Sequence, residues 1–314
     1  MSKIEIRTAY GEALKELGGQ NEKIVVLEAD VGSSTKSALF GQQYPDRYFN
    51  VGIAELNMVS MAAGLAVSGL VPFVNTFAVF LTTRGGDAIQ SLIAHDKLNV
   101  KLAGAYSGLS DSYDGSSHQA VTDVAIMRAL PDMTVISVCD STQTRQAVAA
   151  AAAHNGPVYL RLSRAATDAV YAENSPFTIG KGNVLREGAD VTIVAAGCMV
   201  QKSLAAAELL KADGLDACVI DMHTIKPLNE ALLLQAAQKT GAVVTAEEHS
   251  VIGGLGGAVS EYLAGAYPVP VLRVGMQDCF GASGDYETLL HQFGLDAVTI
   301  AAKAREAIAL KARK

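Results

Sequence analysis

The sequence predicts an α/β protein of two domains, each a mainly parallel sheet flanked by helices. Three observations support this fold class. Short apolar runs rich in β-branched residues alternate with helical patterns along the chain. A stretch containing Pro, Gly and Asn interrupts this rhythm once, at 165–190. The 314 residues are enough for two domains of ordinary size. We therefore expect a first domain at 1–170 and a second at 180–314.

The first domain contains runs that are apolar along their length, as expected of strands buried on both faces. These runs lie at 23–30, 100–106, 133–140 and 157–163. Helical patterns accompany them at 8–18, 55–68, 82–96, 120–129 and 142–154. Alternation of this kind is typical of βα units around a parallel sheet.

The same rhythm returns after 165–190, a stretch that we interpret as a linker with a short hairpin. Strands are expected at 191–197, 217–222, 242–249 and 270–276, and helices at 200–213, 229–239, 254–266 and 297–312. The glycine-rich "IGGLGGAVSEYLAG" at 252–265 lacks the spacing of a dinucleotide-binding loop. It indicates close packing of a strand on a helix.

Composition narrows the function classes. The net charge of -7 argues against nucleic acid or an anionic membrane as the main partner. No apolar run approaches about 20 residues, so no membrane span is expected. The four cysteines are far apart and form no CxxC pair, which indicates reduced thiols and a cytoplasmic location.

Glu55 is the first candidate functional residue. It opens a helical stretch of small and apolar residues, "ELNMVSMAAGLAV", which offers the acid no polar face. A helix N-terminus favours negative charge, so a capping role is the simplest interpretation. A buried acid kept for proton exchange is the alternative.

Two further stretches carry candidate ligand contacts. Phe77 and Phe80 lie three apart at an expected strand-to-helix junction, where they can form one flat wall beside a planar ligand, whereas Phe73 is expected in the core. The loop "SGLSDSYDGSSHQAVTD" at 107–123 brings Asp114 and His118 close enough to line one opening. Its small polar residues favour a ligand with hydroxyl groups.

Arginines at strand ends indicate an anionic substrate. Arg7 begins the first helix, and Arg161 and Arg164 flank the end of the strand at 157–163. Guanidinium groups match phosphate oxygens bidentately. Ser33 and Ser34 could add hydroxyl and backbone donors.

Together these stretches resemble the carboxyl-terminal half of the transketolase family, in family order and over nearly the whole chain. "VGIAELNM" is similar to the segment whose acid activates thiamine diphosphate, which implies that role for Glu55. "TFAVF" resembles the segment whose aromatic residues pack on the pyrimidine ring, which implies cofactor contacts for Phe77 and Phe80. Asp30 matches the position near the subunit interface that also borders the cofactor.

The resemblance also implies substrate contacts. "YDGSSHQ" is similar to the family's "DGPTHQ", so Asp114 would contact a substrate hydroxyl and His118 the reacting sugar. Arg7, Ser34 and Arg164 match the phosphate contacts. Ser116 and Ser117 replace the family's Pro and Thr, and Tyr106 or Ser107 occupies the area of a family histidine. The sugar is by default one of the pentose phosphate pathway, and the altered loop leaves an unusual ketose phosphate open.

The chain contains no "GDG…N" segment, with which transketolases hold diphosphate and Mg²⁺ in an amino-terminal half. No metal ligand is therefore expected in this chain. The resemblance implies a split transketolase whose second, diphosphate-binding subunit holds Mg²⁺, as an α2β2 complex that also self-associates through both domains described here. Its reaction would move a two-carbon ketol unit from a ketose phosphate to an aldose.

Three alternatives remain open on sequence. The chain could be a beta subunit of a 2-oxo acid dehydrogenase, a deoxyxylulose-phosphate-synthase-like enzyme, or a non-catalytic interaction subunit that kept the fold.

Overall fold

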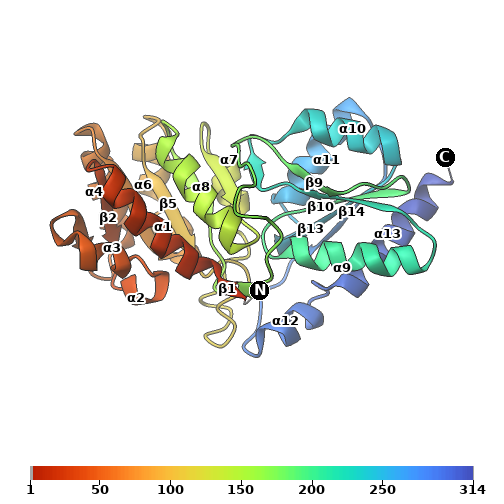
Figure 1. Cartoon of the computed structure of the whole chain (residues 1–314), viewed down its shortest axis with the longest axis horizontal. Helices are drawn as coiled ribbons and strands as arrows, with labels where there is room; N and C mark the ends of the chain where they lie inside the picture. The colour runs from red at the N-terminus through yellow and green to blue at the C-terminus, as the bar shows by residue number, and fades with distance from the viewer. Residues whose placement is uncertain (1–2, 314) are drawn as a thin grey trace.

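Two sheets form the two halves of the molecule in the computed structural model, which describes residues 3–313. Figure 1 shows the amino-terminal half, from red to yellow-green, beside the carboxyl-terminal half, from green to blue. Each sheet is mainly parallel, and helices flank both sheets. The predicted fold class is therefore confirmed.

The first sheet has seven strands in the order β12-β6-β7-β5-β4-β2-β3. They are β2 (Ile24–Glu28), β3 (Tyr48–Asn50), β4 (Val71–Phe77), β5 (Lys101–Ala105), β6 (Thr134–Ser137), β7 (Val158–Arg161) and β12 (Thr224–Lys226). All neighbours are parallel except β12, which runs antiparallel to β6. The carboxyl ends of the parallel strands thus meet at one edge.

The helices of this half agree with the sequence except in the region 82–96. They are α1 (Ile6–Gln20), α2 (Gly32–Thr35), α3 (Ala38–Gln43), a 3₁₀ turn (Pro45–Arg47), α4 (Glu55–Val67), α5 (Ala78–Arg84), α6 (Gly86–Ala88), a π-helical turn (Ile89–Ala94), α7 (Asp123–Ala129) and α8 (Ser141–Ala153). The single helix expected at 82–96 is wrong in detail, because a break at Gly85 and a π-helical turn divide it.

The second sheet has the order β14-β13-β10-β11-β9. Its strands are β9 (Asn183–Arg186), β10 (Val191–Ala195), β11 (Ala217–Asp221), β13 (Val243–Ser250) and β14 (Val271–Met276). Its helices are α9 (Met199–Ala212), α10 (Glu230–Thr240), α11 (Leu255–Ala266), α12 (Tyr286–Gln292) and α13 (Ala297–Lys311). Every expected strand and helix is present, and α12 is an addition.

The hairpin expected within 165–190 is wrong. β8 (Ala166–Thr167) pairs with β1 (Ile4–Glu5) at the start of the chain, and β9 pairs with β11 of the second sheet. Both pairs join segments far apart in sequence, which a local pattern of turn residues does not reveal. Figure 1 shows β1 close to the junction of the two halves.

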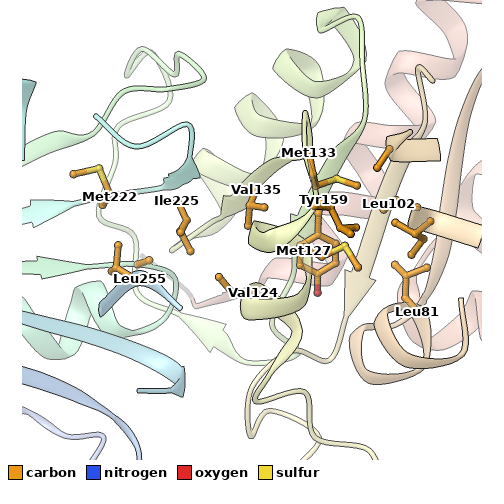
Figure 2. Close-up of a cluster of buried hydrophobic side chains, with 14 of the residues drawn as sticks. Leu81, Leu102, Val124, Met127, Met133, Val135, Tyr159, Met222, Ile225 and Leu255 are labelled. Atoms are coloured by element: carbon orange, nitrogen blue, oxygen red, sulfur yellow. The ribbon is translucent and has the colours of Figure 1, made fainter. Parts of the chain in front are cut away.

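One hydrophobic cluster continues from the first half into the second. It joins Leu102 and Val135 of the first sheet to Met222, Ile225 and Leu255, and Figure 2 shows these side chains in a row across the junction. A continuous packed core holds its surroundings in one arrangement, because close-packed interiors deform little. The two halves therefore meet in a fixed orientation across this core.

Two bulk expectations concern thiols and membranes. Cys139, Cys198 and Cys218 are buried free thiols, as predicted, and Cys279 is exposed. Among the helices formed by residues 3–313, none has the length and apolar character that crossing a membrane requires.

Candidate functional site

The candidate residues follow the carboxyl ends of neighbouring strands in the first sheet. Ser34 follows β2, Glu55 follows β3, Phe77 ends β4, and Arg164 follows β7. Tyr106 comes directly after β5. Ligands of open parallel sheets bind at this edge, and the contacts below connect the residues into one strip.

Glu55 begins α4, and its side chain is 5% exposed. Its Oε1 accepts a hydrogen bond from Arg84 Nη1 at 3.2 Å, so the acid is paired with a base that is itself half exposed. The small and apolar residues of α4 indicate a buried helix, but only one of its faces is buried. One face contacts the core through Met58 and Val59, while Leu56 and other apolar residues of the opposite face are exposed.

Aromatic rings form the next part of the strip. Phe77 and Phe80 have ring centroids 5.9 Å apart with an angle of 26° between the rings. Tyr106 also stacks on Phe77, at 4.4 Å and 24°. His118 meets Phe80 edge-on at 5.2 Å, and Arg84 lies over Phe80 at 4.1 Å. We call these two nearly parallel rings, Phe77 and Phe80, the aromatic wall, and Phe73 is fully buried in the core as expected.

Two guanidinium groups approach Tyr106. Arg7 donates from Nη1 to the Tyr106 hydroxyl and to the Ser34 carbonyl oxygen, the latter at 3.2 Å. The Cζ atoms of Arg7 and Arg164 lie 5.4 and 5.2 Å from the Tyr106 ring centroid. The structure therefore brings Arg7, Ser34 and Arg164 together around one tyrosine.

Each guanidinium also has a carboxylate partner. Arg7 binds Glu5 with two hydrogen bonds of 3.0 Å, and Arg164 Nη1 donates to Asp111 Oδ1 at 3.3 Å. Burial, and then the nearby charge of Asp114, raise the pKa of Asp111 to about 6. Asp111 Oδ2 has no hydrogen-bond partner among residues 3–313. The arginine pair is thus close to neutral overall.

The loop between β5 and α7 carries Asp114 and His118. Asp114 is exposed at its tip, and the His118 ring contacts Ser117 Oγ through Nδ1 at 2.9 Å. Both side chains lie on the loop that the sequence singled out, and His118 reaches the aromatic wall. Asp30 has a positive φ of 60°, is exposed, and accepts a hydrogen bond from Asn50 at 3.0 Å. It therefore contacts the β3 end of the strip and not the rings.

One expectation from the sequence is corrected. Arg161 does not join the anion-binding group, because it is 6% exposed and its Nε donates to Asp123 at 2.8 Å. Burial alone would raise the pKa of Asp123, but the charges of Arg161 and His249 outweigh it and lower that pKa. Arg161 is a structural ion pair.

Sequence reasoning missed three residues of the strip: Tyr106 as a stacking ring, and Arg84 and Asp111 as ion-pair partners. Tyr106 was noted only as a replacement in the loop. A basic residue after the aromatic pair and a second acid in the "SDSYD" stretch were the available signals. Residues 3–313 contain no group of three or more His, Cys, Asp or Glu side chains arranged to hold a metal ion.

The fold and the site together indicate the class of protein. It is a two-domain α/β protein with a carboxylate, an aromatic wall and arginines at one sheet edge. Residues 2–169 match the family described as "Transketolase, pyrimidine binding domain", and residues 180–300 match "Transketolase, C-terminal domain". The chain belongs to the transketolase family. The family implies dependence on thiamine diphosphate and a transferase-type enzyme subunit.

Three similar proteins are described as parts of transketolases. The chain is 45% identical to the "6-deoxy-6-sulfo-D-fructose transketolase subunit SqwH" of Clostridium sp. (strain MSTE9), covering 96% of this chain and 94% of that protein. It is 43% identical to the "Putative transketolase C-terminal section" of Methanocaldococcus jannaschii, covering 96% and 95%. A solved structure described as "Split gene transketolase, inactive beta4 tetramer" has a TM-score of 0.91 and 48% identity, covering 99% of this chain and 100% of that one.

Proposed function

We propose that this chain is one subunit of a split, thiamine-diphosphate-dependent transketolase that moves a two-carbon ketol unit from a sugar donor to an aldose. The observation that carries the proposal is the unbroken strip of contacts from Glu55 through Arg84, Phe80, Phe77 and Tyr106 to the arginines. It combines a buried acid, a flat apolar wall and an anion-binding group at one strand edge.

The described residues fit the pyrimidine half of thiamine diphosphate. A buried carboxylate, joined through Arg84 to nearly parallel aromatic rings, offers a planar heterocycle a hydrogen-bond acceptor and a stacking surface. When bound, the cofactor supplies a carbon centre that holds the two-carbon fragment between donor and acceptor. Glu55 would bind and exchange the proton of an aminopyrimidine ring nitrogen.

Residues of the loop would act on the sugar. His118, whose ring touches the aromatic wall, would bind oxygen atoms at the reacting carbons, and Asp114 would accept a hydrogen bond from a substrate hydroxyl. Arg7, Ser34 and Arg164 would hold the terminal anionic group. Phe77 and Phe80 would exclude water from the ring, and Asp30 would border the cofactor from the β3 side.

A second subunit would complete the site. Its diphosphate-binding domain would hold the cofactor's diphosphate and Mg²⁺, and the assembly would be α2β2, with contacts between copies of this chain. Exposed apolar side chains surround Glu55, among them Ile53 at 74% and Leu56 at 48% exposure. An apolar surface beside a half-built site is suited to burial against a partner. We propose that it seats the diphosphate-binding subunit.

The terminal group of the donor is proposed as a phosphate, with a sulfonate as second candidate. Glu5 and Asp111 bring one carboxylate to each arginine, which weakens the attraction for a doubly charged phosphate more than for a singly charged sulfonate. One relative is described as acting on 6-deoxy-6-sulfo-D-fructose. The terminal group of a pentose phosphate or of a sulfonated hexose would therefore bind to the same residues, Arg7, Ser34 and Arg164.

Reconstitution tests the proposal. The purified chain, with thiamine diphosphate and Mg²⁺, is assayed for ketol transfer from phosphorylated and sulfonated ketoses, alone and after mixing with a chain that carries the "GDG…N" segment. We expect turnover only in the mixture. Glu55→Gln should lower turnover at least about 100-fold with an unchanged circular dichroism spectrum. Glu16→Gln, an exposed acid of α1, is the matched control. Robust turnover by the chain alone would refute the split-subunit proposal.

A further inference from the structure

The loop that carries Asp114 and His118 is tied at its base within the first half. Gly108 N donates to the Ala120 carbonyl oxygen at 2.9 Å, and Ala120 N donates back to Gly108 at 3.1 Å. These two hydrogen bonds close the loop formed by residues 108–120. Its placement must come from whatever contacts the residues between 108 and 120, since loops without such contacts move freely.

Glu248 of the second half makes the first of these contacts. It lies in β13, is 2% exposed, and its Oε1 accepts a hydrogen bond from Leu109 N at 2.6 Å. Its Oε2 accepts from the Tyr286 hydroxyl at 3.0 Å, so both carboxylate oxygens are used. Gly108 has a φ of +63°, and a Cβ there would overlap the Glu248 carboxyl group. The loop backbone and this carboxylate thus fit closely.

A second segment of the carboxyl-terminal half holds the loop further along. Gly284 N donates to the Ser112 carbonyl oxygen at 2.9 Å, and Gln119 Nε2 donates to the Ala282 carbonyl oxygen at 2.9 Å. Ser112 and Gln119 stand on either side of Asp114 and His118. The loop is therefore held on both sides of its functional residues by the segment between β14 and α12.

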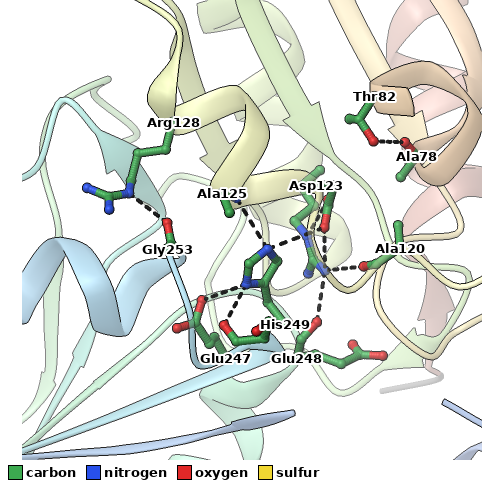
Figure 3. A network of polar contacts seen from close by, with 12 residues as sticks. Ala78, Thr82, Ala120, Asp123, Ala125, Arg128, Glu247, Glu248, His249 and Gly253 are labelled. Carbon is green, nitrogen blue, oxygen red and sulfur yellow. Dashed lines mark hydrogen bonds and ion pairs between the residues drawn. The ribbon is translucent and has the colours of Figure 1, made fainter. Parts of the chain in front are cut away.

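Glu248 is itself fixed from the first half. Arg161 Nη2 donates to the Glu248 carbonyl oxygen at 2.8 Å and to that of Ala120 at 3.1 Å, while its Nε binds Asp123. Figure 3 shows Asp123 and Ala120 of the first half beside Glu247, Glu248 and His249 of the second, linked by dashed polar contacts. Arg161, which forms an ion pair with Asp123, thus also anchors β13, the strand that carries Glu248.

We propose that Glu248 is a positioning residue: through the Leu109 amide, and together with residues 281–284, it fixes the loop that presents Asp114 and His118 to the sugar. The inference rests on the proposed function for the roles of these two residues. It gives the carboxyl-terminal half a task in substrate binding, although that half contributes no side chain to the strip of contacts from Glu55 to the arginines.

Glu247 supplies a matched control in the neighbouring position. It is equally buried, but its two oxygens accept from Leu255 N and Gly256 N at 2.7 Å, so it binds the start of α11. Two adjacent acids of one strand therefore hold different elements. Replacing either removes a buried carboxyl group, and only replacement of Glu248 frees the Leu109 amide.

Hydrogen exchange of the folded chain tests the positioning without any activity. Glu248→Leu leaves the Leu109 N–H unpaired, so exchange in 107–119 should rise at least about tenfold. Glu248→Gln retains an acceptor oxygen and should stay within about twofold of wild type. Glu247→Gln should affect the segment at 254–258 and leave 107–119 unchanged. Should Glu248→Leu fail to fold, Tyr286→Phe, which removes the hydroxyl that donates to Oε2, should raise exchange in 107–119 to a smaller extent.

Kinetics of the reconstituted complex supply the second readout. Glu248→Leu should raise KM for the ketose donor about tenfold or more, with Glu248→Gln restoring it, while the thiamine diphosphate Kd stays unchanged. Unaltered exchange in 107–119, or a loosened loop with an unaltered donor KM, would overturn the inference. Absence of ketol transfer in the wild-type complex would instead count against the proposed function, and the exchange experiment distinguishes the two.

Discussion

Arg84 Nη1 lies 3.2 Å from Glu55 Oε1, and the same guanidinium group lies 4.1 Å above the Phe80 ring. One base thus covers both the acid and the aromatic wall that we propose to hold the aminopyrimidine ring. Because Arg84 is half exposed, it can swing away from both. A ring bound against both Glu55 and Phe80 would therefore have to replace this contact.

Arg84→Ala should accordingly strengthen cofactor binding. Loss of a partly exposed ion pair and a cation–π contact removes roughly 1 kcal/mol of competing interaction, which corresponds to about a fivefold lower Kd for thiamine diphosphate. Isothermal titration of the reconstituted complex measures it, with Arg84→Lys as the variant that keeps the charge. A higher Kd in Arg84→Ala would mean that Arg84 supports the bound cofactor and does not compete with it.

The strands and the aromatic wall could be predicted from the sequence because they depend on local pattern. Strands such as β5 and β10 are short, mainly apolar runs with one polar residue each, and Phe77 and Phe80 are placed by a three-residue spacing at a strand end. The resemblance to a family then supplied roles for Glu55 and His118. None of this required knowledge of distant contacts.

The positions of residues that contact partners far away along the chain could not be predicted from local sequence patterns. Arg161 looks like Arg164 in sequence, yet Asp123 and the carbonyl oxygen of Glu248 bury it, and both lie far away along the chain. β12 likewise follows β11 but pairs with β6 of the first sheet. Glu248 was not distinguishable from Glu247, because only the folded chain reveals which of two adjacent acids faces the loop.

Asp111→Asn should favour phosphorylated donors. The substitution removes the carboxylate that shares Arg164, so KM for a ketose phosphate should fall about threefold to tenfold at pH 7.5, with a smaller fall for a sulfonated ketose.

The pH dependence gives this prediction a second test. Since the pKa of Asp111 is raised to about 6, the wild-type carboxyl is charged at pH 7.5 and largely neutral at pH 5.5. Wild type and variant should therefore differ less at the lower pH. Steady-state kinetics at both values decides it, and an equal difference at both would remove Asp111 from this role.

Asp221 makes the stability of the chain depend on pH. Its Oδ2 accepts hydrogen bonds from Gln143 Nε2 at 2.6 Å and from the Tyr171 hydroxyl at 2.7 Å, and burial raises its pKa from 3.8 to about 7. That value is the net result of burial, the largest cause, and the nearby charge of Asp140, which raise the pKa, and of the hydrogen bonds from Tyr171, Gln143 and Cys139, which lower it. A raised carboxyl pKa adds stability below about pH 4 that is lost as the pH rises through 7.

Asp221→Asn keeps an acceptor for both donors and removes the titration. Urea denaturation measures the free energy of unfolding of both proteins at each pH. The difference, Asp221→Asn minus wild type, should be larger at pH 8 than at pH 5. Burial also raises the pKa of Glu248 to about 7, so a residual decline with pH should persist in the variant. Asp216→Asn, an exposed acid just before the same strand, is the control. Parallel curves for wild type and Asp221→Asn would contradict the assignment.

The exposed apolar face beside Glu55 should be required for assembly and not for folding. Leu56 points away from the core on the first turn of α4, so Leu56→Asp adds a charge at the surface and should shift the thermal midpoint of the isolated chain by no more than about 2 °C. Burying that charge against a partner costs several kcal/mol, so association with the diphosphate-binding subunit should weaken about 100-fold or more in sedimentation velocity experiments. Val298→Asp, on the exposed side of α13, makes the same chemical change in the other half and should leave assembly intact. If Leu56→Asp assembled as well as Val298→Asp, the partner would have to bind elsewhere, and Glu55 would lie outside the interface that is meant to enclose the cofactor.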